Sequence, residues 1–242
     1  MTARVTRDYS QQIRDGEGDD DYARYMRTDS LLSLQRVPEE VVHRDELLFQ
    51  VVHQSSELWL KLGCSELDEA ARRIRSGDLD GAIALLGRAG LGVELITQQL
   101  EMLRLLSPWD FQVIRTVLGH GSGADSPGWR SVQRSGRALS AAFDALLAER
   151  GIDLADLYRD HQGSPEHRLA EALVDWDERI SLWRVRHYKI ANRIIGKAIG
   201  TQGTPVDTLA RLIEYSFVPQ LWRVRSELTR TGPMGDYHVV DQ

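Results

Sequence analysis

The segment from residue 46 to residue 67, ELLFQVVHQSSELWLKLGCSEL, constrains the fold of this chain more than any other stretch. Its side chains repeat at steps of three and four residues, which places one face of a helix at Phe49, Val52, Ser56 and Leu60. A second set of apolar residues widens that face: Leu48, Val51, Leu58 and Leu62. The pattern predicts a mostly buried helix with few positions in contact with solvent.

Two histidines lie on apolar faces of separate predicted helices. His53 lies within the stripe just described, and His187 lies in a run whose apolar positions step by three and four: Trp176, Ile180, Trp183, Ile190 and Ile194. An imidazole in such a position is costly unless its ring nitrogens find partners. Backbone carbonyls would satisfy both rings in an ordinary core, and the periodicity alone favours that interpretation. A haem held in an apolar slot by one imidazole and faced by the other explains the same pattern.

Helix-start signals recur along the chain. Serine–proline pairs occur at residues 107–108 and 164–165, where the serine caps a helix and the proline fits its first turn. Other patterns predict helices over residues 79–104 and 132–151, a helix within residues 22–35 that docks on the core, and a final helix that starts at residues 204–207 and runs through Trp222. No segment has the alternation of a convincing β-strand. The prediction is an all-α, single-domain helical bundle.

Length and composition define the class of protein. The chain has 242 residues, a formal net charge of −6 and one cysteine, Cys64. The negative charge argues against nucleic acid or an anionic membrane as the main partner, and no apolar run approaches the roughly 20 residues that span a bilayer. One cysteine excludes an internal disulfide and a cysteine-rich metal site, so we expect a cytoplasmic protein. We also expect a flexible arm at residues 1–20, one domain over residues 21–230 and a tail at residues 231–242.

Phe111 and Arg115 lie four residues apart on the helix predicted to begin at Pro108, so they share a face. Arg115 can grip a carboxylate through two parallel hydrogen bonds, or it can be a solvated surface arginine, which is the usual case. The HExxH zinc motif, the phosphate-loop motif and the Gly-x-Ser-x-Gly nucleophile motif are absent from the sequence.

Ordered blocks of the sequence resemble the tryptophan 2,3-dioxygenase family. The block from His43 to Phe49, followed by Val52-His53-Gln54 and Glu57-Leu58-Trp59, is similar to the family's HDELLF…HQ…ELW helix. Five other blocks match in the family's order: Tyr22, Tyr25 and Met26; Pro108, Phe111 and Arg115; Ser122, Gly123, Ser126 and Arg130; Trp183, Arg184, Arg186, His187, Arg193, Ile195, Gly196, Gly200 and Thr201; and residues 217–225. The resemblance extends from Tyr22 to about Arg225.

The resemblance implies an enzyme with haem b between two long helices. It implies that His187 is the axial ligand of the iron, with Trp183, Ser122 and Gly123 also at the cofactor, and that His53 faces the substrate indole from the distal side. It assigns substrate contacts to Phe49, Phe111, Arg115 and Thr201. In the family's homotetramer, residues matching Tyr22, Tyr25 and Met26 enter the neighbouring subunit's active site, so we expect a homo-oligomer, either a tetramer or a dimer.

The reaction implied is the O2-dependent cleavage of the indole ring of L-tryptophan or a close analogue to an N-formylkynurenine-type product. Departures from the family pattern cluster at the amino-acid end of the pocket: Phe111 for a tyrosine, Ala124-Asp125 for Phe-Gln, and Pro205 in a glycine-rich loop. They favour a second hypothesis, a haem-dependent monooxygenase of specialised metabolism that makes an oxindole or hydroxylated product from tryptophan or a substituted tryptophan. A non-catalytic haem or indole sensor and a purely structural bundle are the remaining alternatives.

Overall fold

The computed structural model describes residues 11–198, 200, 203 and 205–235. This part of the chain contains no β-strand, which confirms the all-α prediction. Its helices are α1 (Asp21–Met26), α2 (Thr28–Leu32), α3 (Glu46–Ser76), α4 (Leu79–Leu103), α5 (Pro108–Arg115), α6 (Pro127–Arg150), α7 (Leu154–Asp160), α8 (Pro165–Ile195), α9 (Asp207–Arg211) and α10 (Pro219–Thr231). None of the helices in this part combines the length and apolar character needed to span a membrane.

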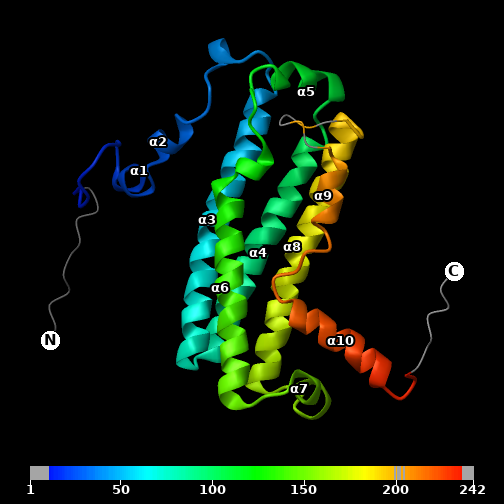
Figure 1. The fold of residues 1–242 in the computed structure, drawn as a ribbon. Helices are drawn as coiled ribbons and strands as arrows, with labels where there is room; N and C mark the ends of the chain where they lie inside the picture. The colour runs from blue at the N-terminus through cyan, green and yellow to red at the C-terminus, as the bar shows by residue number, and fades with distance from the viewer. Residues whose placement is uncertain (1–10, 199, 201–202, 204, 236–242) are drawn as a thin grey trace, which may run out of the picture.

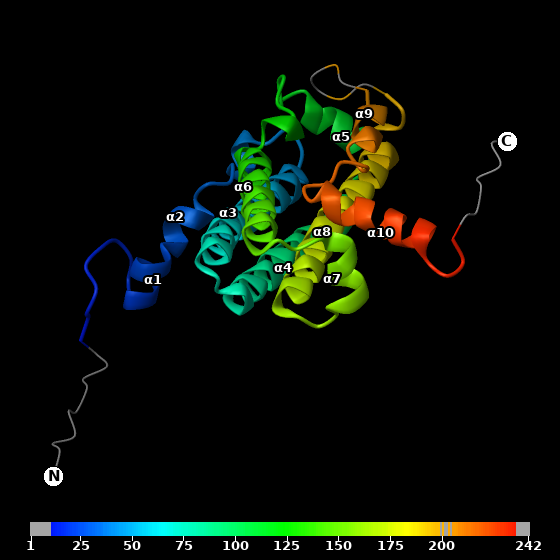
Figure 2. The same ribbon diagram turned by 60° about the horizontal axis from the view of Figure 1, so that its bottom comes forward.

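Four long helices, α3, α4, α6 and α8, form the bundle (Figures 1 and 2). Helix α4 packs against both α3 and α8, and α6 packs against α3. The larger buried core fills this bundle and includes Leu67, Phe143 and Trp176. A smaller second core joins the start of α3 to the ends of α4 and α8, near α5: Val52, Leu100, Leu103, Ile190 and Ile194. Trp183 packs against both cores, so it lies where they meet.

The helix starts follow the serine–proline pairs. Ser107 accepts a hydrogen bond from the backbone N–H of Asp110 at 3.2 Å, and Ser164 accepts one from His167 at 3.1 Å. Ser126 caps α6 in the same way, so that helix begins at Pro127 rather than at the predicted residue 132. Each cap satisfies an N–H group that the helix itself leaves without a partner.

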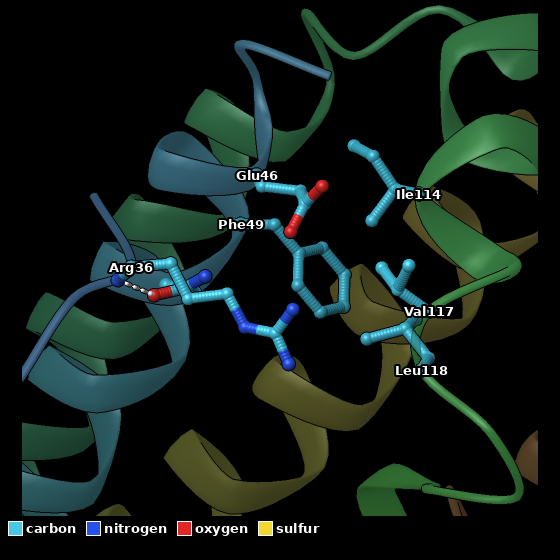
Figure 3. Close-up of a pocket in the computed structure, with 7 residues that line it drawn as sticks. Arg36, Glu46, Phe49, Ile114, Val117 and Leu118 are labelled. Carbon is cyan, nitrogen blue, oxygen red and sulfur yellow. Dashed lines mark hydrogen bonds between the residues drawn. The ribbon is translucent and has the colours of Figure 1, made fainter. Parts of the chain in front are cut away.

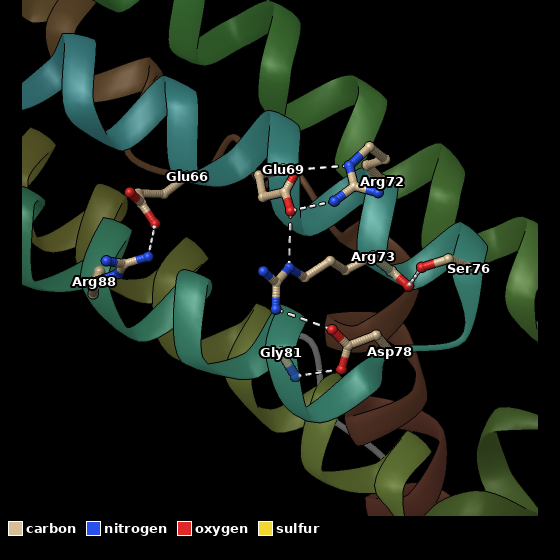
Figure 4. A network of polar contacts seen from close by, with 8 residues as sticks. All are labelled: Glu66, Glu69, Arg72, Arg73, Ser76, Asp78, Gly81 and Arg88. Carbon is tan, nitrogen blue, oxygen red and sulfur yellow. Dashed lines mark hydrogen bonds and ion pairs between the residues drawn. The ribbon is translucent and has the colours of Figure 1, made fainter.

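The α3–α4 hairpin is held by a network of charged side chains (Figure 4). Glu69 accepts hydrogen bonds from Arg72 and Arg73, and these bonds lower the pKa of Glu69 to about 2. Arg73 also pairs with Asp78, whose carboxylate accepts the backbone N–H of Gly81 at 3.0 Å. The contacts join the end of α3 to the start of α4 and fix the reversal of the chain.

The predicted single final helix is wrong, because residues 212–218 separate α9 from α10. Pro219 begins α10, since proline has no N–H and disfavours helical geometry in the residue before it. The buried carboxylate of Asp177 receives the backbone N–H of Phe217 at 3.0 Å and the indole N–H of Trp222 at 2.9 Å. Phe217 also packs so tightly on α6 that a Cβ on Gly136 would lie 2.5 Å from its ring.

Two expectations about burial are also wrong for this single chain. Helix α3 is not mostly buried: Leu47, Val51, Leu58 and Leu62 lie on an exposed face, with about half of each side chain accessible. Helices α1 and α2 contain no buried residue and lie away from the bundle instead of docking on its core (Figure 1).

Candidate functional site

His187 has the properties of an available ligand. It lies one turn after Trp183 on α8, and the two rings stack with centroids 4.8 Å apart and planes 9° from parallel. Burial, together with repulsion from His53, lowers the pKa of His187 to about 4. Neither of its ring nitrogens finds a hydrogen-bond partner in the part of the chain that is described. The imidazole is therefore neutral at pH 7 and has a lone pair to donate.

His53 lies on α3, one turn after Phe49. Its Nδ1 is 2.7 Å from the carbonyl oxygen of Phe49, a distance that assigns the proton to Nδ1 and leaves a lone pair on Nε2. Burial lowers the pKa of His53, against the opposing effects of that hydrogen bond and of Glu57. The residue is nevertheless exposed to solvent in this single chain. Its charge acts on His187, which places the two imidazoles within electrostatic reach of each other.

Aromatic side chains lie next to each other beside His53. The rings of Phe49 and His53 lie 4.1 Å apart, and the ring of Phe111 on α5 lies 5.9 Å from that of Phe49. Phe49 also lines a pocket of about 230 Å³ between the start of α3 and the segment around α5 (Figure 3). The other lining residues are Arg36, Glu46 and Gln50 on one side and Ile114, Val117 and Leu118 on the other.

These residues fit a haem. A haem needs an apolar slot and at least one good axial ligand, and neutral imidazole is such a ligand. The second core supplies apolar side chains from α3, α4 and α8 beside both histidines. His187 needs no deprotonation before it binds a metal at pH 7, because its pKa is already low.

Comparison with known proteins identifies the family. A model of the family named tryptophan 2,3-dioxygenase matches residues 8–141, more than half of the chain. The chain belongs to the tryptophan 2,3-dioxygenase family. It is 30% identical to the tryptophan 2,3-dioxygenase of Arthrobacter sp. (strain FB24), with 93% of this chain and 95% of that protein covered. It is 31% identical to the tryptophan 2,3-dioxygenase of Kineococcus radiotolerans, with 94% and 96% covered. Members of this family are haem-dependent oxidoreductases, and this chain is an enzyme of that class.

Arg115, Ser122 and Gly123, which the family resemblance also singled out, lie at the end of α5 and in the loop that follows it. Arg115 is half-buried at the end of α5, where its guanidinium lies 3.4 Å from the side-chain oxygen of Gln112. Ser122 and Gly123 lie in the loop between α5 and α6, where the backbone N–H of Ser122 donates to Asp125 at 3.1 Å. Thr201 lies outside the described residues.

The residues of α1 do not join the site of their own chain. At least half of the surface of each of these residues, Tyr22, Tyr25 and Met26, is exposed. The guanidinium carbon of Arg14 lies over one face of the Tyr25 ring, 4.6 Å from its centroid. Figure 1 shows α1 and α2 extending away from the bundle. In a single chain, these members of the tryptophan 2,3-dioxygenase signature therefore have no contact with the two histidines.

Sequence analysis did not predict the structural roles of two residues beside the site, Trp129 and Glu57. The ring of Trp129 lies 3.9 Å from that of Trp183, and Trp129 packs against the larger core. Glu57 on α3 binds the start of α6 through the hydroxyl of Ser126 and the backbone N–H of Gly128. The Ser126-Pro127 pair was the available signal, because it would have placed Trp129 in the first turn of α6.

Proposed function

We propose that this protein is a haem-dependent oxygenase that acts with O2 on the indole ring of L-tryptophan or a close analogue, giving an N-formylkynurenine-type product. The observation that carries the proposal is the pair of neutral imidazoles, His53 and His187, beside one apolar core and within electrostatic reach of each other. The family match adds the class of reaction.

In this proposal, His187 holds the iron of haem b, and Trp183, Ser122 and Gly123 contact the cofactor. When bound, the haem supplies the activation of O2. His53 faces it from α3 and accepts a hydrogen bond from the substrate's indole N–H through Nε2. The bond from Nδ1 to the Phe49 carbonyl supports this role, because it fixes the ring's tautomer and orientation.

Substrate positioning falls to residues of α3 and α5. Phe49 and Phe111 flank the indole, and the pocket that Phe49 lines with Ile114, Val117 and Leu118 supports this role. Arg115 grips the substrate carboxylate, and Thr201 contacts the amino-acid end. Holding the substrate in one orientation lowers the barrier to reaction by removing freedom before the chemical step.

The proposed protein is a homo-oligomer, a tetramer or a dimer, in which Tyr22, Tyr25 and Met26 of one subunit complete the site of another. Two observations support it. Helix α1 exposes its aromatic side chains, and α3 exposes the apolar face formed by Leu47, Val51, Leu58 and Leu62. An exposed apolar helix face is typical of an interaction site.

Turnover under labelled O2 tests the proposal. Purified protein loaded with haem and reduced is supplied with L-tryptophan, and the product is analysed by mass. Two labelled atoms in one ring-opened product support the proposal. One labelled atom would show a monooxygenase, the function that the changed residues at the amino-acid end favour. No product from tryptophan or its methylated analogues, with haem bound, would indicate a sensor, and no haem uptake would indicate a structural bundle.

A further inference from the structure

We infer that Trp129 is a positioning residue, which holds Trp183 against His187 and thereby fixes the plane of the proposed haem ligand. The inference rests on the proposed function for the role of His187. It assigns a role in orienting the proposed haem ligand to a residue of α6, whereas the ligand itself lies on α8.

Three aromatic rings form a continuous series of contacts from α6 into the site. Trp129 contacts Trp183 with ring centroids 3.9 Å apart and planes tilted by 35°. Trp183 contacts His187 at 4.8 Å with nearly parallel planes. Trp183 and His187 are one turn apart on α8 and cannot move independently of that helix, whereas Trp129 approaches from another element. Trp129 therefore adds a contact to Trp183 from outside α8.

The start of α6 is anchored firmly enough to hold a neighbouring ring. The carboxylate of Glu57 receives the hydroxyl of Ser126 and, at 2.8 Å, the backbone N–H of Gly128. A negative charge at this position also favours the helix N-terminus. Gly128 packs so closely on α3 that a Cβ would lie 2.6 Å from Glu57 and 2.8 Å from Leu60. Trp129 follows directly, so its backbone position is set by α3.

His187 needs a contact that orients its ring, because within the described part of the chain it makes no hydrogen bond of the kind that usually orients a metal-binding histidine. A histidine that binds a metal ordinarily donates its other ring N–H to a carboxylate, a carbonyl or water, and this bond fixes the ring. Among the described residues, none accepts a hydrogen bond from His187. The imidazole stacks on Trp183, and Trp183 in turn contacts Trp129, so Trp129 restricts the imidazole by limiting the movement of the ring against which it lies.

The test compares Trp129→Leu, which removes the stacked ring, with Trp129→Phe, which keeps one. Leu139→Ala on the same helix is the matched control, because Leu139 is fully buried in the main core and belongs to no ring stack. Two quantities are measured: the rate of haem transfer to an excess of apomyoglobin, and the NMR shifts of the His187 ring protons in the haem-free protein. Trp129→Met, which fills the space without a ring, replaces Trp129→Leu if that variant does not fold.

We expect Trp129→Leu to lose haem about 10- to 100-fold faster, the range typical for loss of a residue that orients a metal ligand. Its His187 protons should move downfield, because they no longer lie over a fixed indole. Trp129→Phe should rescue both quantities, and Leu139→Ala should lower stability without moving the resonances. Unchanged rates and shifts in Trp129→Leu would overturn the inference. Failure of the proposed function gives a different result: haem is not bound by the wild type, or is fully retained by His187→Ala.

Discussion

Among single residues, burial decides the chemistry of the two histidines. Helical spacing in the sequence is enough to place His53 and His187 on apolar faces. It does not reveal that His53 bonds to Phe49 while His187 has no bonding partner in the described chain. The bond of His53 is local, to a carbonyl one turn earlier on α3. The burial of His187 and its nearness to His53 depend instead on packing between segments more than 100 residues apart, which periodicity within one helix does not record.

The low pKa of His187 predicts a pH dependence of stability in the haem-free protein. The unfolded chain protonates this ring near its ordinary pKa of 6.5, but the folded chain does so only near about 4. Stability is therefore fully present above pH 6.5 and decreases as the pH falls toward 4, by at most about 3 kcal/mol from this ring. Urea unfolding of the wild type and of His187→Gln between pH 4 and 7.5 measures how the free energy of unfolding changes with pH. The wild type should show the steeper loss, and parallel curves would contradict the assignment.

Substitution of Arg115 should separate substrates by their carboxylate. If Arg115 grips that group, Arg115→Ala should raise the KM for tryptophan about 10- to 100-fold, because a hydrogen bond to a charged group contributes about 1.5–3 kcal/mol. Tryptamine has the same ring and no carboxylate, so its KM should change little. Steady-state kinetics with both substrates measures the effect. An equal loss with tryptamine would mean that Arg115 acts through the fold.

Among the helices, local signals predicted starts better than ends. The serine–proline pairs placed α5 and α8 correctly, and the same signal at Ser126 would have placed α6. The break between α9 and α10 was missed although Pro219 marks it. What holds that break is Asp177 on α8, about 40 residues away, and such a partner is not evident from the local sequence.

Asp177 should therefore be essential for the position of α10. Asp177→Ala leaves the N–H groups of Phe217 and Trp222 without their buried acceptor, which should lower the free energy of unfolding by at least about 1.5–3 kcal/mol. Urea denaturation of the haem-free protein measures the change. The control is Asp175→Ala, an exposed residue on the same helix that pairs with Arg179, and we expect a change within about 1 kcal/mol. Equal effects of the two substitutions would exclude the anchoring role.

For the whole molecule, the sequence predicted the architecture but misjudged which faces are covered. The apolar stripe of α3 is real, yet one side of it is exposed in a single chain, as are the aromatic residues of α1. Periodicity shows that a helix face is apolar. It does not show whether other helices of the same chain or a second copy of the chain bury that face. The same ambiguity explains why α1 and α2 were expected to dock on their own core.

Mixed oligomers test whether α1 acts on a neighbouring subunit. One variant carries Tyr22→Ala, Tyr25→Ala and Met26→Ala, the other carries His187→Ala, and each alone should be inactive. Joint refolding should recover about a quarter of the wild-type activity if subunits pair at random, because one site in four then has an intact His187 and an intact neighbouring α1. Mixing the triple variant with a chain that carries all four substitutions should recover none. Absence of recovery in the first mixture would show that α1 serves its own chain or none.

The contact between Gly136 and Phe217 has a consequence for how this sequence can vary. Because even one added methyl group on α6 would overlap the benzyl ring, residue 136 can grow only when residue 217 shrinks. The two positions should therefore change together among natural homologues, with a bulkier residue at the first accompanied by a slimmer one at the second. Such compensation would preserve the packing of α6 against the segment before α10 while other parts of the sequence diverge.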